Sequence, residues 1–317
     1  MHQRDVIGLG NSALDTIGLI PRLPQLDSRV ALEDMTRQGG GQVAQALVTL
    51  ARLGATAGFV GRVGDDEAGA LIRAGLAEEG VEVAYLQTTP GARSKQSMIL
   101  VDRDTGKRSI CAFAGTAGEI ALDSQTLDYL SSGRFLHLDG HSAAAAAIAA
   151  RQAARSGVRV CLDAGAGMNV DGLLPLIRET HVLIAAEDFT MAASPAGTVA
   201  AGAAHLLTLG PEIVVVTLGE RGSYTLTASA ELSTAPFPVS VVDTTGAGDV
   251  FHGAYLFGLL QGWDLASTAE FAGATAALKC TQLGGRAAIP RLPEVVAFMA
   301  ARGRPLATVP APLNERR

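Results

Sequence analysis

The amino-acid sequence predicts an α/β fold, in which a mainly parallel central sheet lies between layers of helices. Between residues 122 and 216, short apolar runs of strand length alternate with segments of helical periodicity. The 37 glycines and only 4% aromatic residues suit many short turns between strands and helices. With 317 residues, 48% of them hydrophobic, the chain can bury a large core.

The charge and the cysteine content exclude several classes of function. The formal net charge is −6 and no basic run occurs, which argues against nucleic-acid binding as the main role. Cys111, Cys161 and Cys280 show neither a zinc spacing nor a disulfide framework, so we expect buried thiols in a reducing compartment. Neither a signal peptide nor an apolar run of transmembrane length is found, so we expect a cytoplasmic protein with no membrane partner.

The first predicted strand, Val6–Leu9, stops at Gly10 and is followed by two polar side chains, Asn11 and Asp15. Ligands of open α/β sheets bind beyond the carboxyl ends of the strands, so both residues are candidates for substrate binding. A carboxylate that accepts bonds from two hydroxyls suits the vicinal diol of a sugar. A turn that uses Asn and Asp for backbone bonds is the open alternative.

Three further stretches predict a small second sheet, apart from the main domain. Residues 16–32 alternate loosely and contain two prolines, which suit edge strands. Lys95–Asp102 and Lys107–Phe113 are strand-like runs, and Asp104-Thr105-Gly106 between them predicts a hairpin turn.

A glycine-rich stretch, Gly39-Gly40-Gly41, opens a predicted helix that stops at Gly54 and carries Gln42 and Gln45 in its first turns. The glycines would let the backbone come close to a ligand. After the next predicted strand and Gly61-Arg62-Val63-Gly64, residues 66–79 form a predicted amphipathic helix.

Three later strands are predicted over residues 135–138, 158–162 and 182–184, and each is followed by an acidic residue: Asp139, Asp163 and Glu187. The helical segments between them predict parallel pairing through crossover connections. Ser142 is predicted to cap the alanine-rich helix that follows the first of these strands. The polar strand ends again direct ligands to one edge of the sheet.

A strand, a glycine turn and a helix follow one another from Pro238 onward. Pro238–Val242 is predicted to end a strand, Gly246-Ala247-Gly248 forms a tight turn, and a helix begins at Asp249. Unpaired N–H groups at such a helix start attract phosphate, although the lysine and spacing of a Walker A loop are lacking. Asp249 would repel a resting phosphate, so its carboxylate suits a base that takes a proton from a hydroxyl attacking that phosphate. A helix cap is the alternative role for Asp249.

Two stretches resemble the signatures of the ribokinase-like (PfkB) carbohydrate kinase family. Asp243–Phe251 resembles its C-terminal signature, Gly40–Asp66 resembles its N-terminal signature, and the resemblance spans about residues 5–300. It implies a ribokinase-like three-layer sandwich with a mainly parallel central sheet and a small β-sheet lid over the sugar site. The lid would be built from residues 15–36 and 93–114 of a single kinase domain, 1–317, and would join two chains in a homodimer.

The resemblance also implies roles for individual residues. Asp249 would be the catalytic base, and the anion hole for the moving phosphate would consist of Gly246, Ala247 and Gly248. The substrate-binding set would be Asn11, Asp15, Gly40, Gly41, Gln42, Gln45, Arg108 and Asp249. The nucleotide-binding set would be Thr217, Gly219, Gly222, Gly248 and Cys280. Among metal-binding residues, Glu187 would order water around Mg²⁺, and a monovalent cation such as K⁺ would be held by Asp243 and Thr245.

Simpler explanations stay open for some of these residues. A solvated strand charge explains Arg108 equally well. An acid at the start of a helix explains Glu187. A β-turn explains Gly219 and Gly222.

The implied reaction transfers the γ-phosphate of ATP, with Mg²⁺ on the phosphates, to a hydroxyl of a small sugar. A neutral ketohexose-like sugar is the first expectation, and a sulfonated sugar, a phosphorylated sugar or a nucleoside are the alternatives. The few aromatic residues argue against the base of a nucleoside. A sensor of sugars or nucleotides with weak turnover is a further alternative. Gln42 and Gln45 stand where family members often carry Asn, and the Asn of the family's motif before Glu187 is missing.

Overall fold

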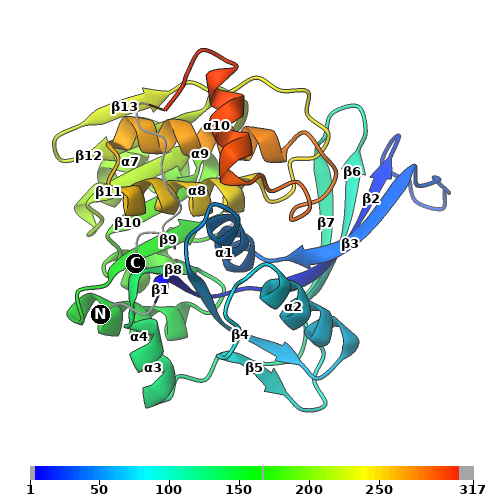
Figure 1. The fold of residues 1–317 in the computed structure, drawn as a ribbon, viewed down its shortest axis with the longest axis horizontal. Coiled ribbons are helices and arrows are strands. Elements are labelled where there is room, and N and C mark those ends of the chain that lie inside the picture. Colours follow the sequence, from blue (N-terminus) through cyan, green and yellow to red (C-terminus); the bar gives the residue numbers. More distant parts are fainter. Residues whose placement is uncertain (1–3, 166–167, 307–317) are drawn as a thin grey trace.

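The computed structural model describes residues 4–165 and 168–306, and within these ranges the chain forms a large and a small β-sheet (Figure 1). The large sheet has nine strands in the order β13-β12-β11-β10-β9-β8-β1-β4-β5 over the described residues. From β5 to β11 the neighbours are parallel, and β12 and β13 are antiparallel. The predicted mainly parallel sheet is therefore confirmed. Its strands are β1 (Arg4–Leu9), β4 (Ala57–Gly64), β5 (Leu86–Thr89), β8 (Gly133–Asp139), β9 (Arg159–Ala164), β10 (Val182–Ala186), β11 (Ile213–Thr217), β12 (Ser223–Thr227) and β13 (Glu231–Thr234).

Two layers of helices cover the two faces of this sheet, because alternate strand residues point to opposite sides. Each face of the sheet carries one hydrophobic cluster. Val6 of β1 and Val182 and Ile184 of β10 belong to the first cluster, whereas Ile7 and Leu183 belong to the second, on the other face. The first cluster is closed by α1 (Gln42–Arg52), α2 (Glu67–Glu78), α8 (Ala247–Gln261), α9 (Leu265–Lys279) and α10 (Leu292–Ala300). The second is closed by α3 (Ser124–Leu130), α4 (Ala143–Arg155), α5 (Val170–Ile177), α6 (Glu187–Ala192) and α7 (Val199–Thr208). The sheet between two helical layers is the predicted three-layer arrangement.

The direction of the chain across the sheet reverses between β1 and β8. From β1 the chain proceeds to β4 and β5 on one side, and β8 to β11 then follow on the other side. In open α/β sheets, ligands bind at the carboxyl ends of the strands beside such a switch point. Leu9 at the end of β1 is paired with Leu138 of β8, so the residues that follow them meet at this edge.

The small sheet projects from one end of the molecule (Figure 1) and has the order β3-β2-β6-β7. Its face toward the main domain carries Asp15 and a small cluster of Ile17, Ile99 and Val101, against which Leu283 packs. The hairpin turn predicted at residues 104–106 is confirmed. The strands are β2 (Ala13–Ile20), β3 (Asp34–Gly40), β6 (Gln96–Asp102) and β7 (Arg108–Phe113).

Several local predictions are wrong. The strand expected at the sheet edge within residues 16–32 is part of β2, which lies between β3 and β6, and Cys111, expected to be buried, is exposed. Pro238–Val242 is not part of a strand, since prolines cannot donate to a sheet ladder and the Val242 N–H donates instead to the Cys280 carbonyl at 2.8 Å. Gly61 and Gly64 lie inside β4 rather than after it. Ser142 precedes α4 at the cap position, but its side chain accepts no cap bond.

Among the helices of residues 4–165 and 168–306, none has the length and apolar character needed to cross a membrane.

Candidate active site

The N-terminus of α8 has the features of an anion site. Gly246, just before the helix, has a left-handed backbone with φ of 73°, which glycine adopts without steric cost. The Ala247 N–H donates to the Thr244 carbonyl at 3.2 Å, whereas the N–H groups of Gly246 and Gly248 have no acceptor among the described residues. A Cβ added at Gly248 would meet nothing within 4 Å, so the space beside this helix start is open to an anion.

Asp249 is the third residue of α8, and Gly246 occupies the cap position, so Asp249 is not the helix cap that its sequence also allowed. The side chain is half-buried. Burial raises the pKa of Asp249 to about 6; Arg108 opposes this rise, and the Asp15 and Asp139 carboxylates add to it. A carboxyl group that titrates near neutral pH suits a proton acceptor.

Asp15 is buried beneath the corner between β3 and α1, where two glycines allow close approach. A Cβ at Gly40 would lie 1.8 Å from Asp15 Oδ2, so only a glycine leaves room for this carboxylate. Gly41 has φ of 98°, and its Cβ would lie 2.5 Å from the Asn11 carbonyl oxygen. Burial raises the pKa of Asp15. The hydrogen bond from the Ser97 side chain and the positive charge of Arg286 oppose this rise.

Asn11 and Asp139 meet at the switch point between β1 and β8. The Asn11 N–H donates to Asp139 Oδ2 at 2.7 Å, and the His141 N–H donates to Asp139 Oδ1 at 3.0 Å. Burial raises the pKa of Asp139 despite these bonds. The Asn11 side-chain oxygen is buried and has no partner within the described ranges, so an acceptor is left for a ligand donor.

A second buried carboxylate, Asp163, lies beside Asp139, since the two residues are partners in the pairing of β8 and β9. Asp163 Oδ1 is 3.7 Å from Nε2 of His252, which α8 supplies one turn after Asp249. Burial raises the pKa of Asp163 well above its ordinary value, and the Asp249 and Asp139 charges raise it further. Burial lowers the pKa of His252 well below its ordinary value, so both partners favour their uncharged forms.

The two predicted glutamines occupy different places. Gln42 begins α1 and hydrogen-bonds the Asp163 side chain, so it faces the strand ends. Gln45 is buried, and its Nε2 lies within 2.6 Å of the positions that Cβ atoms of Gly246 and Gly285 would take. Gln45 therefore fills the space between two loops. The Oε1 atoms of both glutamines are buried without a partner among the described residues.

The hairpin of the small sheet contacts the loop before α8. The Thr244 hydroxyl and N–H both donate to the Gly106 carbonyl, at 3.1 and 3.3 Å. Arg108 Nη1 donates to the Thr244 hydroxyl at 3.0 Å, so the predicted arginine lies beside the anion site although its side chain is exposed.

The predicted nucleotide residues Thr217, Gly219 and Gly222 lie together at the end of β11. Gly219 and Gly222 have φ of 59° and 88°, and the Leu218 N–H donates to the Gly222 carbonyl at 2.9 Å, which closes a turn. Glu187, at the start of α6, forms an ion pair with Arg221 of the same turn. The carboxylate predicted to order water around Mg²⁺ thus already has a cationic partner.

The residues predicted for a monovalent cation lie together behind the anion site. Asp243 accepts the Thr245 N–H at 2.7 Å and the Gly284 N–H at 2.8 Å, so its carboxylate joins two loops. The Thr245 hydroxyl is buried and has no partner in the described part of the chain. Cys280, the fifth predicted nucleotide residue, is buried, and its carbonyl accepts the Val242 N–H at 2.8 Å.

The described residues contain no group of three or more His, Cys, Asp and Glu side chains that could hold a metal ion. Divalent magnesium commonly keeps several waters and binds through substrate phosphates, with one or two carboxylates from the protein. An ion held mainly by nucleotide phosphates would need no such group from the protein.

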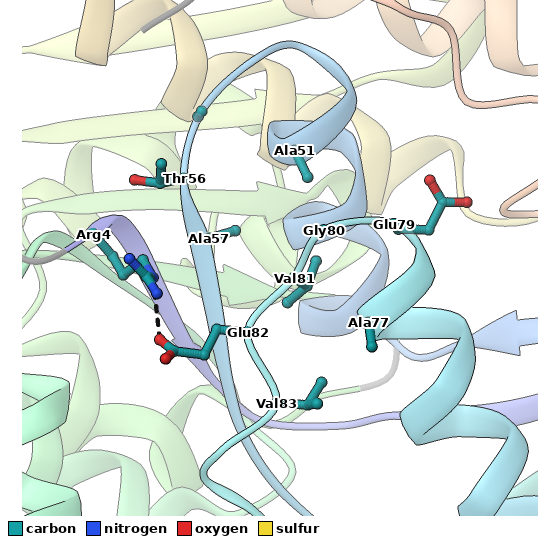
Figure 2. A pocket seen from close by; sticks show the side chains of 11 residues that line it. Arg4, Ala51, Thr56, Ala57, Ala77, Glu79, Gly80, Val81, Glu82 and Val83 are labelled. Atoms are coloured by element: carbon teal, nitrogen blue, oxygen red, sulfur yellow. Dashed lines mark hydrogen bonds and ion pairs between the residues drawn. The ribbon is translucent and has the colours of Figure 1, made fainter. Parts of the chain in front are cut away.

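A pocket of about 520 Å³ lies away from these residues, at the amino ends of β1 and β4 (Figure 2). The Arg4–Glu82 ion pair and the ends of α1 and α2 border it, and it contains none of the predicted site residues. In a parallel sheet, this is the edge opposite to the one where ligands bind.

Several residues at the site were not predicted from the sequence. Asp139 and Asp163 were predicted as polar strand ends at the ligand edge, but without an individual role in the site. Gln38 accepts the Arg286 N–H at 2.6 Å, and the Arg286 guanidinium is buried against Gly39, but their sequence contexts carry no signal. Lys279 is the last residue of α9, and a basic residue in the last turn of a helix is an ordinary feature, so it carried no signal either.

Comparison with known proteins matches residues 4–292 to "pfkB family carbohydrate kinase". An ATP-dependent ribose-1-phosphate kinase of Halopiger xanaduensis is 27% identical over 297 residues, which cover 94% of this chain and 98% of that protein. A 5-dehydro-2-deoxygluconokinase of Shouchella clausii is 27% identical over 319 residues, with 94% and 96% covered.

Solved structures have the same fold. The crystal structure of ribokinase from Thermotoga maritima superimposes with a TM-score of 0.78 at 26% sequence identity. The superposition covers 94% of this chain and 99% of that one. These similarities extend over both sheets and over the whole candidate site.

Proposed function

Because the chain belongs to the pfkB family of carbohydrate kinases, we propose that it transfers the γ-phosphate of ATP to a hydroxyl of a neutral, ketohexose-like sugar. One observation carries this proposal. A half-buried carboxylate with a raised pKa, Asp249, lies in the first turn of α8, beside the N–H groups of Gly246 and Gly248 that have no acceptor among the described residues. A base beside an anion site is what phosphoryl transfer to a hydroxyl requires.

In this mechanism, Asp15 and Asn11 accept hydrogen bonds from sugar hydroxyls and hold the sugar beside α8. Asp249 accepts the proton of the attacking hydroxyl as the new O–P bond forms. The raised pKa supports this role, because a base is most effective when its pKa lies near the working pH. ADP leaves with the electron pair of the broken bond.

The free N–H groups of Gly246 and Gly248 would donate to the oxygens of the phosphoryl group during transfer. Gly246 and Gly248, with Ala247 between them, thus form the proposed anion hole. Magnesium, bound with the nucleotide, would add positive charge that neutralises the phosphates. Thr217, Gly219, Gly222 and Cys280 stay predicted as nucleotide contacts, and Glu187 as a contact to magnesium-bound water.

The chemistry of the strand ends favours a neutral polyhydroxyl substrate. Asp15, Asp139 and Asp163 are buried carboxyl groups, and Asn11 and Gln42 each present a buried oxygen with no partner among the described residues. Such a surface offers hydrogen-bond acceptors, which suits hydroxyl donors. Where these carboxyl groups are ionised they would repel a phosphate or sulfonate on the sugar, whereas the buried Arg286 guanidinium near Asp15 would attract one. Because the acidic groups outnumber this cation, we rank phosphorylated and sulfonated sugars below neutral ones.

The deciding experiment measures ADP release with ATP, Mg²⁺ and a panel of sugars. The panel contains ketohexoses, ribose, ribose 1-phosphate, 5-dehydro-2-deoxygluconate, a sulfonated ketohexose and a nucleoside. We expect a ketohexose to give the highest kcat/KM. If ATP binds but no compound raises ADP release above background, the chain is a binding protein and not a kinase. A preference for the phosphorylated or sulfonated sugar would overturn the substrate assignment alone.

The rate should depend on pH through Asp249. The base works only when ionised, and its pKa is raised to about 6. We therefore expect kcat to fall as the pH decreases through about 6, with a slope of one proton. The measurement is kcat at saturating sugar and ATP between pH 5 and 8, with folding followed by circular dichroism at each pH. A rate that stays constant down to pH 5 would argue against Asp249 as the base.

The outer face of the small sheet supports the proposed homodimer. Met35 and Met98 are 62% and 59% exposed on β3 and β6, the two strands that flank β2, and Cys111 is exposed beside Met98. Large apolar side chains clustered on an exposed face commonly mark a protein contact. Light scattering after size exclusion gives the molar mass in solution. The mass of a monomer at micromolar concentration would contradict the proposed homodimer.

A further inference from the structure

Lys279, the last residue of α9, is fully buried and lies directly behind the anion site. Its exposed fraction is 0%, which is rare for a lysine. Its Nζ donates to the main-chain oxygen of Asp243 at 2.8 Å. Asp243 leads into the loop that carries the free N–H groups of Gly246 and Gly248, so the ammonium group supports that loop from behind.

The groups near this ammonium group carry negative charge, as in a site that binds a cation. The carboxylate of Asp243 joins the loop before α8 to the loop after α9 through the N–H groups of Thr245 and Gly284. The C-terminal end of α9 carries the negative end of the helix dipole. Burial lowers the pKa of Lys279, but Asp243 and Asp249 both favour the charged form.

Burying a cation costs free energy unless it is hydrogen-bonded and near negative charge, and Lys279 has both, through the Asp243 carbonyl and the charges of Asp243 and Asp249. The phosphoryl group that would approach the N-terminus of α8 would bring further negative charge. A positive charge behind the loop would counter the negative charge that gathers there during transfer, and would hold the Asp243 carbonyl in place. A free monovalent cation bound among loop carbonyls would do the same two things.

We propose that the Lys279 ammonium group is a built-in monovalent cation, which makes the anion site of this kinase independent of K⁺. Asp243, one of the two residues predicted to hold a monovalent cation, already has a cation of the chain itself on its carbonyl oxygen. Lys279 is thus a positioning residue, since it acts through the Asp243 carbonyl and not on the substrate. The kinetic part of this inference rests on the proposed kinase activity.

The kinetic test compares wild type and Lys279→Ala in KCl, NH₄Cl and tetramethylammonium chloride at equal ionic strength. For the wild type, we expect kcat to agree within about twofold in all three salts, as simple screening would give. In tetramethylammonium chloride, Lys279→Ala should lose about 10- to 100-fold in kcat, somewhat less than the loss of a direct oxyanion donor. Potassium or ammonium ions, which resemble the removed ammonium group in size and charge, should restore part of that loss.

A thermal test does not depend on catalysis. The melting temperature of wild type should be the same in the three salts, whereas Lys279→Ala should melt higher in KCl or NH₄Cl than in tetramethylammonium chloride. If no sugar is phosphorylated but this pattern is found, the proposed function fails and the cation assignment stands.

The matched control is Arg73→Met, which removes a partly buried cation that donates to a backbone carbonyl far from the site. Arg73 donates to the Val83 carbonyl at 3.1 Å and to the Thr88 hydroxyl at 2.9 Å. This variant should lose stability with no selective recovery by K⁺ or ammonium. The proposal is overturned if the wild type requires K⁺ for its rate. It is also overturned if neither the rate nor the melting temperature of Lys279→Ala responds to these cations.

Discussion

Asp249→Asn is expected to reduce kcat by at least about 10³-fold, within the range for loss of a general base. The amide keeps the shape and size of the carboxylate, but it cannot take the proton of the sugar hydroxyl. Sugar and ATP should still bind, because Asp15 and the free N–H groups of α8 are unchanged. The measurements are kcat from ADP release and the dissociation constants of both ligands from titration calorimetry.

The same variant should be more stable than the wild type above pH 6. The pKa of Asp249 is raised in the folded protein, so the folded state holds the proton more tightly than the unfolded chain does. Raising the pH from about 4 to about 6 therefore costs the folded wild type stability, and the neutral amide avoids that loss. Melting temperatures at pH 5 and 8 give the comparison, with the gain expected at pH 8.

Asp171→Asn is the matched control for both effects. Asp171 is also an acid in the first turn of a helix, α5, but it is exposed and is not one of the predicted site residues. It should leave kcat at the wild-type value. Unchanged turnover in Asp249→Asn, with the control also unchanged, would remove Asp249 as the base.

Gly40→Ala is expected to lower kcat/KM by about 10²-fold, the size of effect that a misplacement of about 1 Å can cause at a reacting centre. The new Cβ would lie 1.8 Å from Asp15 Oδ2, so the carboxylate must leave the position in which it faces the sugar. Gly40 does not have a positive φ, so the effect comes from this contact and not from backbone strain. The loss should appear mainly in KM for the sugar, while the KM for ATP stays close to that of the wild type.

Gly172→Ala is its matched control, because a Cβ at Gly172 meets no atom within 4 Å and φ is not positive there. The control should keep wild-type kinetics and a similar melting temperature. A Gly40→Ala enzyme that remains folded and binds sugar as the wild type does would show that Asp15 is not a sugar contact.

The parallel sheet, the hairpin and the glycine turn could be predicted because their signals are local. Apolar runs such as Ile213–Thr217 are buried on both faces and separated by helices, which is the pattern of parallel strands. The turn at residues 104–106 and the helix after Gly246 depend on a few adjacent residues. The strand predicted at Pro238–Val242 is wrong. The β-branched residues of this run favour a strand, but Pro236 and Pro238 have no N–H group to donate to a neighbouring strand.

The candidate site could be predicted only in part. The sequence by itself determined which types of residue lie at the strand ends and that a carboxylate follows the glycine turn. The tertiary structure decided that Gly246, and not Asp249, caps α8, which leaves the Asp249 carboxylate free. It also decided that the charge of Lys279 lies behind the turn, 36 positions away from Asp243 along the chain. Such contacts depend on how helices pack across the sheet, and no pattern of neighbouring residues records that.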